Sequence, residues 1–227
     1  MAPSPDIKAV LGKLKRPAPV RKLTDPLQLI LWDNIGYLID DERRAELFAE
    51  FEERVGLGAE AIGAARAATL FDIAKRGGMH PEERVKRWRT IAKIVGEDAG
   101  GDLTATLKRL PVAKARALIK RFPTFSDPGA DKVLLLAGID ARPAVESNGL
   151  RAMLRLGLIE EGASYGASYK AAIACLASAG EPARAWYTNA YWTLRAHGQA
   201  LCKRTAPLCA KCPLDKVCAH ETLKGQY

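Results

Sequence analysis

The sequence predicts an all-α protein. Apolar residues recur at helical spacing along most of its 227 residues, and no stretch shows the strict alternation typical of a half-buried strand. Glycine, proline and aspartate separate the periodic stretches, as they commonly do between helices. A hydrophobic content of 48% suffices for a substantial core, in one large domain or in two smaller ones.

The helices are predicted from their periodicity and their end signals. Residues 42 to 56 place four apolar side chains on one face after a cap at Asp41. Residues 82 to 96 repeat that pattern after Pro81, a residue suited to a helix start. The remaining predicted helices span residues 112 to 121, 129 to 137, 146 to 157, 167 to 179 and 182 to 197.

The charge balance favours a polyanionic partner. Thirty-five Lys and Arg stand against 26 Asp and Glu, a formal net charge of +9. The alternative is a basic surface that only keeps the protein soluble. No run approaches the roughly 18 apolar residues of a membrane span, and MAPSPDIKAVLGKLKRP has no signal-peptide core. We expect a cytoplasmic protein, associated with the nucleoid if bacterial, with no membrane partner.

Four of the five cysteines crowd near the C-terminus. Cys202, Cys209, Cys212 and Cys218 have the spacing C-x6-C-x2-C-x5-C. The cytoplasm disfavours disulfides, so a metal site made of four thiolates is the better interpretation. The spacing favours an iron-sulfur cube over zinc, because zinc ribbons usually carry two C-x2-C knuckles and this loop has one. A structural zinc site remains the alternative. Cys175 lies among small apolar residues and is expected in the core.

Three segments together resemble one family. The cysteine spacing, preceded by LRAHGQALC at residues 194 to 202, resembles the cluster loop of endonuclease III and its relatives. These are the helix-hairpin-helix (HhH-GPD) DNA glycosylases that carry a [4Fe-4S] cluster. KARALIKRFPTFSDPGADKVLLLAG, residues 114 to 138, is similar to the hairpin of that family. PAVESNGLRAMLRLGLI, residues 143 to 159, resembles its catalytic segment.

The resemblance covers residues from about Asp25 to His220 and implies two all-α lobes. Residues 25–138 would form a six-helix barrel domain that ends in the hairpin. Residues 1–24 and 139–227 would form the iron-sulfur cluster domain, with a [4Fe-4S] cofactor on the four cysteines. Double-stranded DNA containing a damaged base would lie between the lobes, and a monomer is the simplest expectation.

The hairpin turn implies a contact with the DNA backbone at Thr124, Phe125 and Ser126. Backbone N–H groups at the start of the second helix can face a phosphate without reading a base. The family turn normally carries glycine where this chain has Thr124 and Ser126. Glycine allows close approach and positive φ, so the match is weaker here, and an ordinary αα-corner remains the alternative.

Two further surfaces are implied as DNA contacts. Lys203, Arg204 and Lys211 would project from the cluster loop toward phosphates. The stretch LQLILWDNIGYLIDDERR, residues 27 to 44, resembles the first barrel helix and its loop, where many members carry a glutamine that fills the gap left by the flipped base. Tyr37 or Leu38 would wedge the stack instead, unless this stretch is only a buried helix end.

The catalytic position of the family falls on Glu146. A carboxylate there can stabilise an oxocarbenium-like sugar and orient or deprotonate water. The alternative is a helix N-terminal carboxylate that favours the macrodipole. Pro128 falls where bifunctional members have a lysine, and proline offers no nucleophile for a Schiff base.

The expected activity is therefore a monofunctional DNA glycosylase of base-excision repair. Lys114, Lys120 and Lys132 lie nearby in sequence and are expected to face solvent or phosphate, and Asp131 is a competing carboxylate without a counterpart in the family site. Two alternatives stay open. One is a bifunctional glycosylase/AP lyase that uses another lysine, and the other is a non-catalytic DNA-binding protein that keeps the fold and the cluster.

Overall fold

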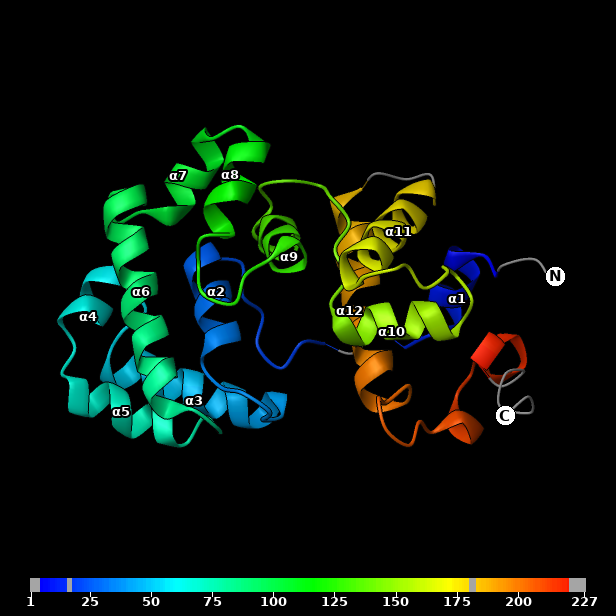
Figure 1. Cartoon of the computed structure of the whole chain (residues 1–227), viewed down its shortest axis with the longest axis horizontal. Coiled ribbons are helices and arrows are strands. Elements are labelled where there is room, and N and C mark those ends of the chain that lie inside the picture. Colours follow the sequence, from blue (N-terminus) through cyan, green and yellow to red (C-terminus); the bar gives the residue numbers. More distant parts are fainter. Residues whose placement is uncertain (1–4, 16–17, 180–182, 221–227) are drawn as a thin grey trace. The chain divides into compact units, whose positions relative to one another are not determined.

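The computed structural model describes residues 5–15, 18–179 and 183–220, which form twelve α-helices, two short 3-10 turns and no β-strand. The predicted all-α class is confirmed. Residues 1–4, 16–17, 180–182 and 221–227, which belong to the expected cluster domain, lie outside the described residues. The chain divides into a terminal unit, Met1–Ala18 with Ala141–Tyr227, and a central unit, Pro19–Asp140 (Figure 1).

The central unit packs around one long helix, α6. Its helices are α2 (Pro26–Asn34), α3 (Asp41–Arg54), α4 (Ala59–Ala64), α5 (Ala67–Lys75), α6 (Pro81–Ala99), α7 (Leu103–Arg109), α8 (Val112–Ile119) and α9 (Asp127–Ala137). Trp88 of α6 is fully buried, with its ring edge-on to Phe51 at a centroid distance of 4.7 Å. Its indole Nε1 donates to the Asn34 carbonyl at 3.1 Å, which fixes the end of α2 against α6.

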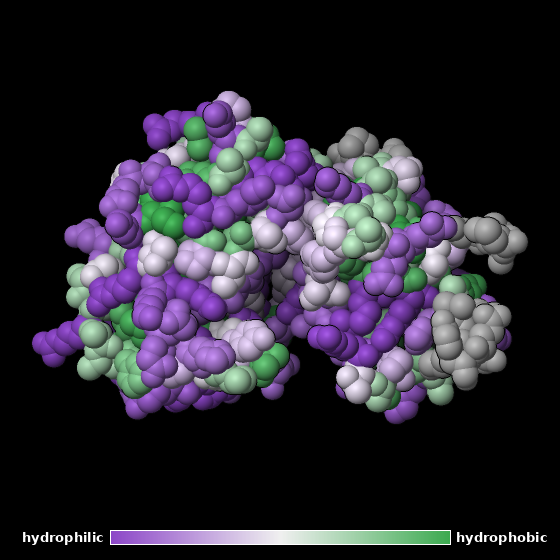
Figure 2. Space-filling model, viewed as in Figure 1, coloured by the Kyte–Doolittle hydropathy of each residue, from purple (hydrophilic) through white to green (hydrophobic). Residues whose placement is uncertain are grey.

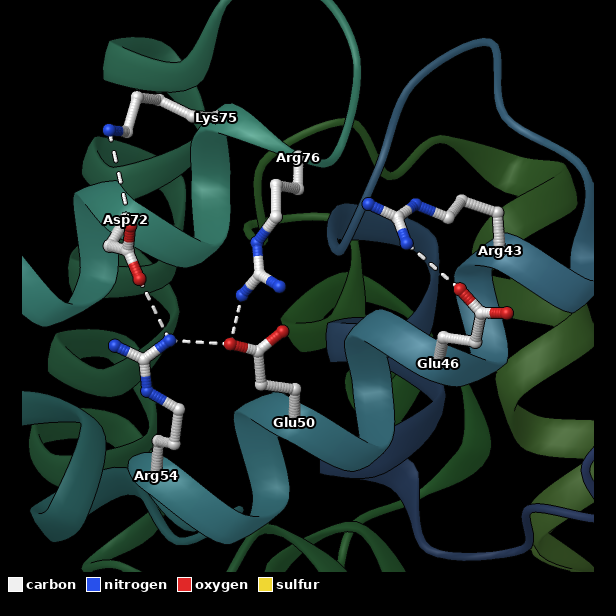
Figure 3. A network of polar contacts seen from close by, with 7 residues as sticks. All are labelled: Arg43, Glu46, Glu50, Arg54, Asp72, Lys75 and Arg76. Atoms are coloured by element: carbon white, nitrogen blue, oxygen red, sulfur yellow. Dashed lines mark hydrogen bonds and ion pairs between the residues drawn. The ribbon is translucent and has the colours of Figure 1, made fainter.

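Charged pairs hold α5 against α3 at the surface of the central unit (Figure 3). Arg54 pairs with Glu50 one turn away and with Asp72 of α5 at 2.8 Å, and Arg76 also pairs with Glu50. Burial opposes ionisation of Glu50, but the hydrogen bonds from Arg54 and Arg76 outweigh it and lower the pKa of that carboxyl. Such exposed ion pairs contribute little individually to stability. We therefore interpret the network as a structural contact between α3 and α5 rather than as a functional site.

The terminal unit joins the start of the chain to its C-terminal half. Its helices are α1 (Ile7–Lys13), α10 (Ser147–Arg155), α11 (Tyr165–Ser178) and α12 (Arg184–Ala200), followed by 3-10 turns at Cys209–Lys211 and Asp215–Val217. α10 lies against α12, and a Cβ on Gly198 would overlap the Asn148 carbonyl, so glycine permits this close approach. Leu194 and Leu214 are fully buried in the shared core.

One helix prediction needs correction, and four helices were not predicted. Asp40 rather than Asp41 caps α3, because its Oδ1 accepts from the backbone N–H of Arg43 at 2.7 Å. The helices α1, α4, α5 and α7, each of six to nine residues, were not predicted. Isolated helices this short are marginal in water and depend on tertiary packing. Hydrophilic side chains dominate the visible face of each unit (Figure 2), and within the described ranges no helix is both long and apolar enough to cross a membrane.

Candidate functional site

The Glu146 carboxylate is clamped at the start of α10. It is the N-cap residue, and its Oε1 accepts from the backbone N–H of Gly149 at 2.8 Å. Its Oε2 accepts from the side-chain amide of Asn148 at 2.8 Å. The helix-terminal role that the sequence left open is therefore present. Both hydrogen bonds also fix the orientation of a half-buried carboxylate, which catalysis would require.

Hydrogen bonds continue from Glu146 toward the first cysteine. Asn148 Oδ1 accepts from Arg151 Nη2 at 2.8 Å. Arg151 Nε in turn donates to the Cys202 carbonyl at 2.9 Å, and Nη2 donates to the Gly198 carbonyl at 2.8 Å. Burial lowers the pKa of Arg151, although the group stays charged. The sequence interpretation singled out neither Asn148 nor Arg151, whose only signal was their place on the same helix as Glu146.

An aromatic side chain also lies near this carboxylate. Tyr165, in the first turn of α11, is 52% exposed. Partial burial and the negative charge of Glu146 raise the pKa of the Tyr165 hydroxyl. The phenol therefore remains protonated at neutral pH and keeps its hydrogen-bond donor.

The four C-terminal cysteines line one hollow. Cys202 follows α12, Cys209 begins the first 3-10 turn, Cys212 follows that turn, and Cys218 follows the second. All four thiols are half-buried, and the hollow that they line is open in part to solvent. In the part of the chain that the structure describes, no three Cys, His, Asp or Glu side chains are arranged to hold a metal ion.

Arg155 ties the cysteine loop to α10. Its Nη1 donates to the Lys203 carbonyl at 2.6 Å and approaches Cys202 Sγ at 3.5 Å, while Nη2 donates to the Arg204 carbonyl at 3.1 Å. The carbonyl of Arg155 accepts from Cys218 Sγ at 3.3 Å. One residue therefore contacts both ends of the loop and leaves the side chains of Lys203 and Arg204 exposed.

The chemistry around Cys212 suits a metal-bound thiolate. The backbone N–H of Leu214 donates to Cys212 Sγ at 3.4 Å, and His197 Nε2 lies 4.0 Å from the same sulfur. Burial raises the pKa of the Cys212 thiol and lowers that of His197, whose Nδ1 is buried with no partner among the described residues. An N–H aimed at a sulfur stabilises a thiolate, so the donor set fits a cysteine-bound metal group.

The hairpin is formed by α8 and α9, and its turn is held by α2. Thr124 has φ +70°, and its hydroxyl donates to Asn34 Oδ1 at 3.4 Å, while the Asn34 amide donates to the Pro123 carbonyl at 3.4 Å. Thr124 and Ser126 are exposed, but Phe125 is only 8% exposed. Of the three residues predicted to contact DNA here, Phe125 is therefore buried, and its backbone N–H donates to the Phe122 carbonyl at 3.2 Å.

The start of α9 already carries a carboxylate. Asp127 pairs with Lys120 at 2.8 Å and with Arg116 at 3.2 Å. The pKa of the Asp127 carboxyl is lowered, chiefly by the hydrogen bond from Lys120. Arg116 also binds the buried Asp131 through two bonds of 2.6 and 3.1 Å. Asp131, the competing carboxylate in the sequence, is thus part of a structural ion pair.

The expectation for Lys132 was wrong. Instead of facing solvent or phosphate it is 8% exposed, forms an ion pair with Asp33 of α2, and lies 5.7 Å from the Phe125 ring centroid. Its position falls on the inward face of α9, where only a paired lysine is tolerated. Lys114 and Lys120 are exposed.

Replacing Thr124 with glycine is expected to raise the free energy of unfolding by about 1 kcal/mol. A β-branched residue with positive φ is strained. Relief of that strain should exceed both the entropy gained by the more flexible unfolded chain and the loss of the long, 3.4 Å hydroxyl bond to Asn34. Urea unfolding measures the change. Ser126→Gly is the matched control, because Ser126 has φ −123° and should gain nothing. A less stable Thr124→Gly protein would contradict the expectation.

Similarity is found among solved structures. No protein-family model and no curated protein matches the sequence. A trapped covalent endonuclease III–DNA intermediate matches with 16% identity and TM-score 0.77, over 99% of this chain and 100% of that one. A non-covalent endonuclease III–DNA complex matches with 16% identity and TM-score 0.77, over 100% of both chains. A thermostable thymine-DNA glycosylase matches with 17% identity and TM-score 0.72, over 96% of this chain and 97% of that one. The fold predicted from the sequence is confirmed.

Proposed function

We propose that this chain is a DNA glycosylase of base-excision repair that removes a damaged base by hydrolysis. The observation that carries the proposal is the Glu146 carboxylate, held by two hydrogen bonds. The sequence resemblance aligns this residue with the family's catalytic aspartate. In that position its charge would stabilise the cationic sugar, and one oxygen would orient the attacking water. The fold shared with endonuclease III and thymine-DNA glycosylase structures supports the class of substrate.

We further propose that lyase activity is weak or absent. Pro128 has no amine, and Lys132, one helical turn further along α9, is paired with Asp33. An ammonium held by a carboxylate is a poor nucleophile, because attack on C1′ requires the neutral amine. Lys120 is likewise paired, with Asp127.

The proposed cofactor is a [4Fe-4S] cluster on Cys202, Cys209, Cys212 and Cys218. The shared hollow and the N–H groups directed at two of the sulfurs support a multi-cysteine metal group there. The cluster would act as a scaffold that fixes the loop carrying the basic side chains. Iron and sulfide analysis of protein from iron-replete cells tests this part separately, and a zinc-only protein would contradict it.

The product assay tests the activity. Purified protein is incubated with duplexes that each carry one lesion, and strands are analysed before and after hot alkali. Abasic product that breaks only in alkali is the expected result. Direct nicking would indicate a lyase that uses another lysine, and no product from any lesion would favour a non-catalytic DNA-binding protein.

Lys203 and Arg204 are expected to contact phosphates. Replacing both with alanine should reduce the slope of log affinity against log salt by about 2, since each phosphate contact contributes close to one unit. The measurement is a salt titration of DNA affinity. Lys170→Ala, an exposed lysine on α11, is the control and should leave the slope unchanged. An unchanged slope in the double variant would remove these two contacts from the proposal.

A further inference from the structure

The last turn of helix α2 contacts both the second helix of the hairpin and its turn. Asp33 forms an ion pair with Lys132 of α9, and Asn34 forms hydrogen bonds with the turn between α8 and α9. The helices α2 and α9 pack against each other within the central unit (Figure 1). These contacts are separate from Tyr37 and Leu38, which follow α2 and are 52% and 77% exposed. Two neighbouring residues of one helix therefore hold the hairpin against the core of the central unit.

The Asn34 side chain is buried and directs polar atoms at the turn. Its amide donates to the Pro123 carbonyl at 3.4 Å as well as to the Ile30 carbonyl at 3.0 Å, and its Oδ1 accepts from the Thr124 hydroxyl at 3.4 Å. The residue is 3% exposed, and its own carbonyl accepts from the fully buried Trp88 indole. Burying an amide is unfavourable unless it is hydrogen-bonded, and an apolar side chain would fill the same space without needing partners. The polar residue is therefore explained by its effect on the turn.

The two contacts with the turn restrain one backbone torsion. The φ angle of Thr124 is the rotation about the bond from its N to its Cα. The Pro123 carbonyl lies on one side of that bond and the Thr124 hydroxyl on the other, so binding both to one buried amide resists rotation about it. The torsion is held at +70°, a region that glycine adopts freely and that strains a β-branched residue. Such strain persists only where surrounding structure imposes it, and here Asn34 supplies the contacts.

The residue after Thr124 is fixed by a separate set of contacts. Phe125 is 8% exposed, and a Cβ on Gly129 would lie only 2.7 Å from its ring, so glycine permits the ring to pack there. The Lys132 ammonium lies 5.7 Å from the centroid of the same ring and pairs with Asp33. Because the Phe125 ring is fixed in the core, the torsion of Thr124 decides how the exposed backbone of the turn faces solvent.

We infer that Asn34 is a positioning residue for the contact between the hairpin turn and a DNA phosphate, because it imposes on Thr124 the positive φ that a glycine would adopt without help. The inference rests on the proposed function, since it takes duplex DNA as the partner of the hairpin. Backbone N–H groups are directional donors, so they bind a phosphate better when their directions are set before binding. A turn free to relax away from +70° would have to be reordered by the DNA, which costs affinity.

A double-variant cycle tests the inference by affinity for an undamaged duplex, without requiring excision. Asn34→Leu keeps the branched shape of the side chain and removes its polar atoms, and we expect it to bind the duplex about tenfold more weakly than wild type. Thr124→Gly alone should bind within about twofold of wild type, since glycine keeps a positive φ unaided. The double variant should bind within about twofold of Thr124→Gly, because the glycine no longer needs Asn34.

Two further variants separate the geometry of the turn from general stability. Thr124→Val removes the hydroxyl and keeps the β-branch, so it should bind the duplex about threefold more weakly than wild type, whether or not Asn34→Leu folds. Thr106→Val removes a buried hydroxyl of α7 that donates to the Ala99 carbonyl at 3.2 Å, outside the hairpin. It should lose stability and bind the duplex as wild type does. Urea midpoints check that each variant is folded under the binding conditions.

The outcomes separate this inference from the proposed function. A folded Asn34→Leu protein that binds like wild type would overturn the inference, and so would a loss that Thr124→Gly does not restore. Wild-type affinity in Thr124→Val would overturn it as well. Restored binding in a protein that excises no lesion would contradict the glycosylase and leave the role of Asn34 standing. Normal excision with unrestored binding would contradict the role of Asn34 and leave the glycosylase standing.

Discussion

Replacing Glu146 with glutamine is expected to lower single-turnover base excision by about 10²- to 10⁴-fold. The substitution removes the negative charge that would face the cationic sugar, but it keeps the side-chain length and an oxygen for the Gly149 N–H. DNA affinity should change less than threefold, because the charge acts on the transition state rather than on bound substrate. The measurement is single-turnover excision at saturating enzyme, with affinity determined in parallel.

The stability of this variant should fall only slightly, by about 1 kcal/mol. Its new amide nitrogen would face the Asn148 amide nitrogen, which in the wild type donates to Glu146 Oε2. Asn148 cannot easily rotate to present its oxygen instead, because that oxygen accepts from Arg151. Glu160→Gln, an exposed glutamate in the same unit, is the control and should excise normally. Full excision by Glu146→Gln would remove Glu146 as the catalytic residue.

The features that the sequence predicted correctly are encoded locally. α3, α6 and α12 are long and strongly periodic, so their apolar faces were visible from spacing alone. The four cysteines lie within seventeen residues, so their grouping was also visible. The short helices α4, α5 and α7 could not be predicted, because their stability comes from packing against the rest of the unit.

The features that were missed depend on partners far along the chain. Lys132 is buried because Asp33, 99 positions earlier, supplies the opposing charge. Arg151 matters because it reaches carbonyls 47 and 51 positions later. The loop that carries Met79 adjoins the one that carries Tyr37 because the backbone of Gly78 pairs with that of Tyr37, 41 positions earlier. No periodicity or spacing in a single sequence reports such contacts.

Replacing Arg151 with methionine is expected to reduce both iron retention and the single-turnover excision rate. The guanidinium makes three hydrogen bonds, to Asn148, Gly198 and Cys202, so its loss should lower the free energy of unfolding by about 3 kcal/mol. Methionine keeps the helical propensity and most of the apolar stem. Iron content, urea unfolding and excision at saturating enzyme measure the three effects.

Arg155→Met is the matched variant, because Arg155 lies four positions along the same helix and also binds the cysteine loop, but it makes no bond to Asn148. It should lose iron more readily and bind DNA more weakly, yet excise at the wild-type rate once enzyme and DNA are saturating. If the two variants slow excision equally, the cysteine loop affects the chemistry through general stability. If only Arg151→Met slows it, the effect comes from the two contacts outside the cysteine loop that Arg155 lacks. These are the bond to Asn148, which leads to the carboxylate, and the bond to the Gly198 carbonyl of α12.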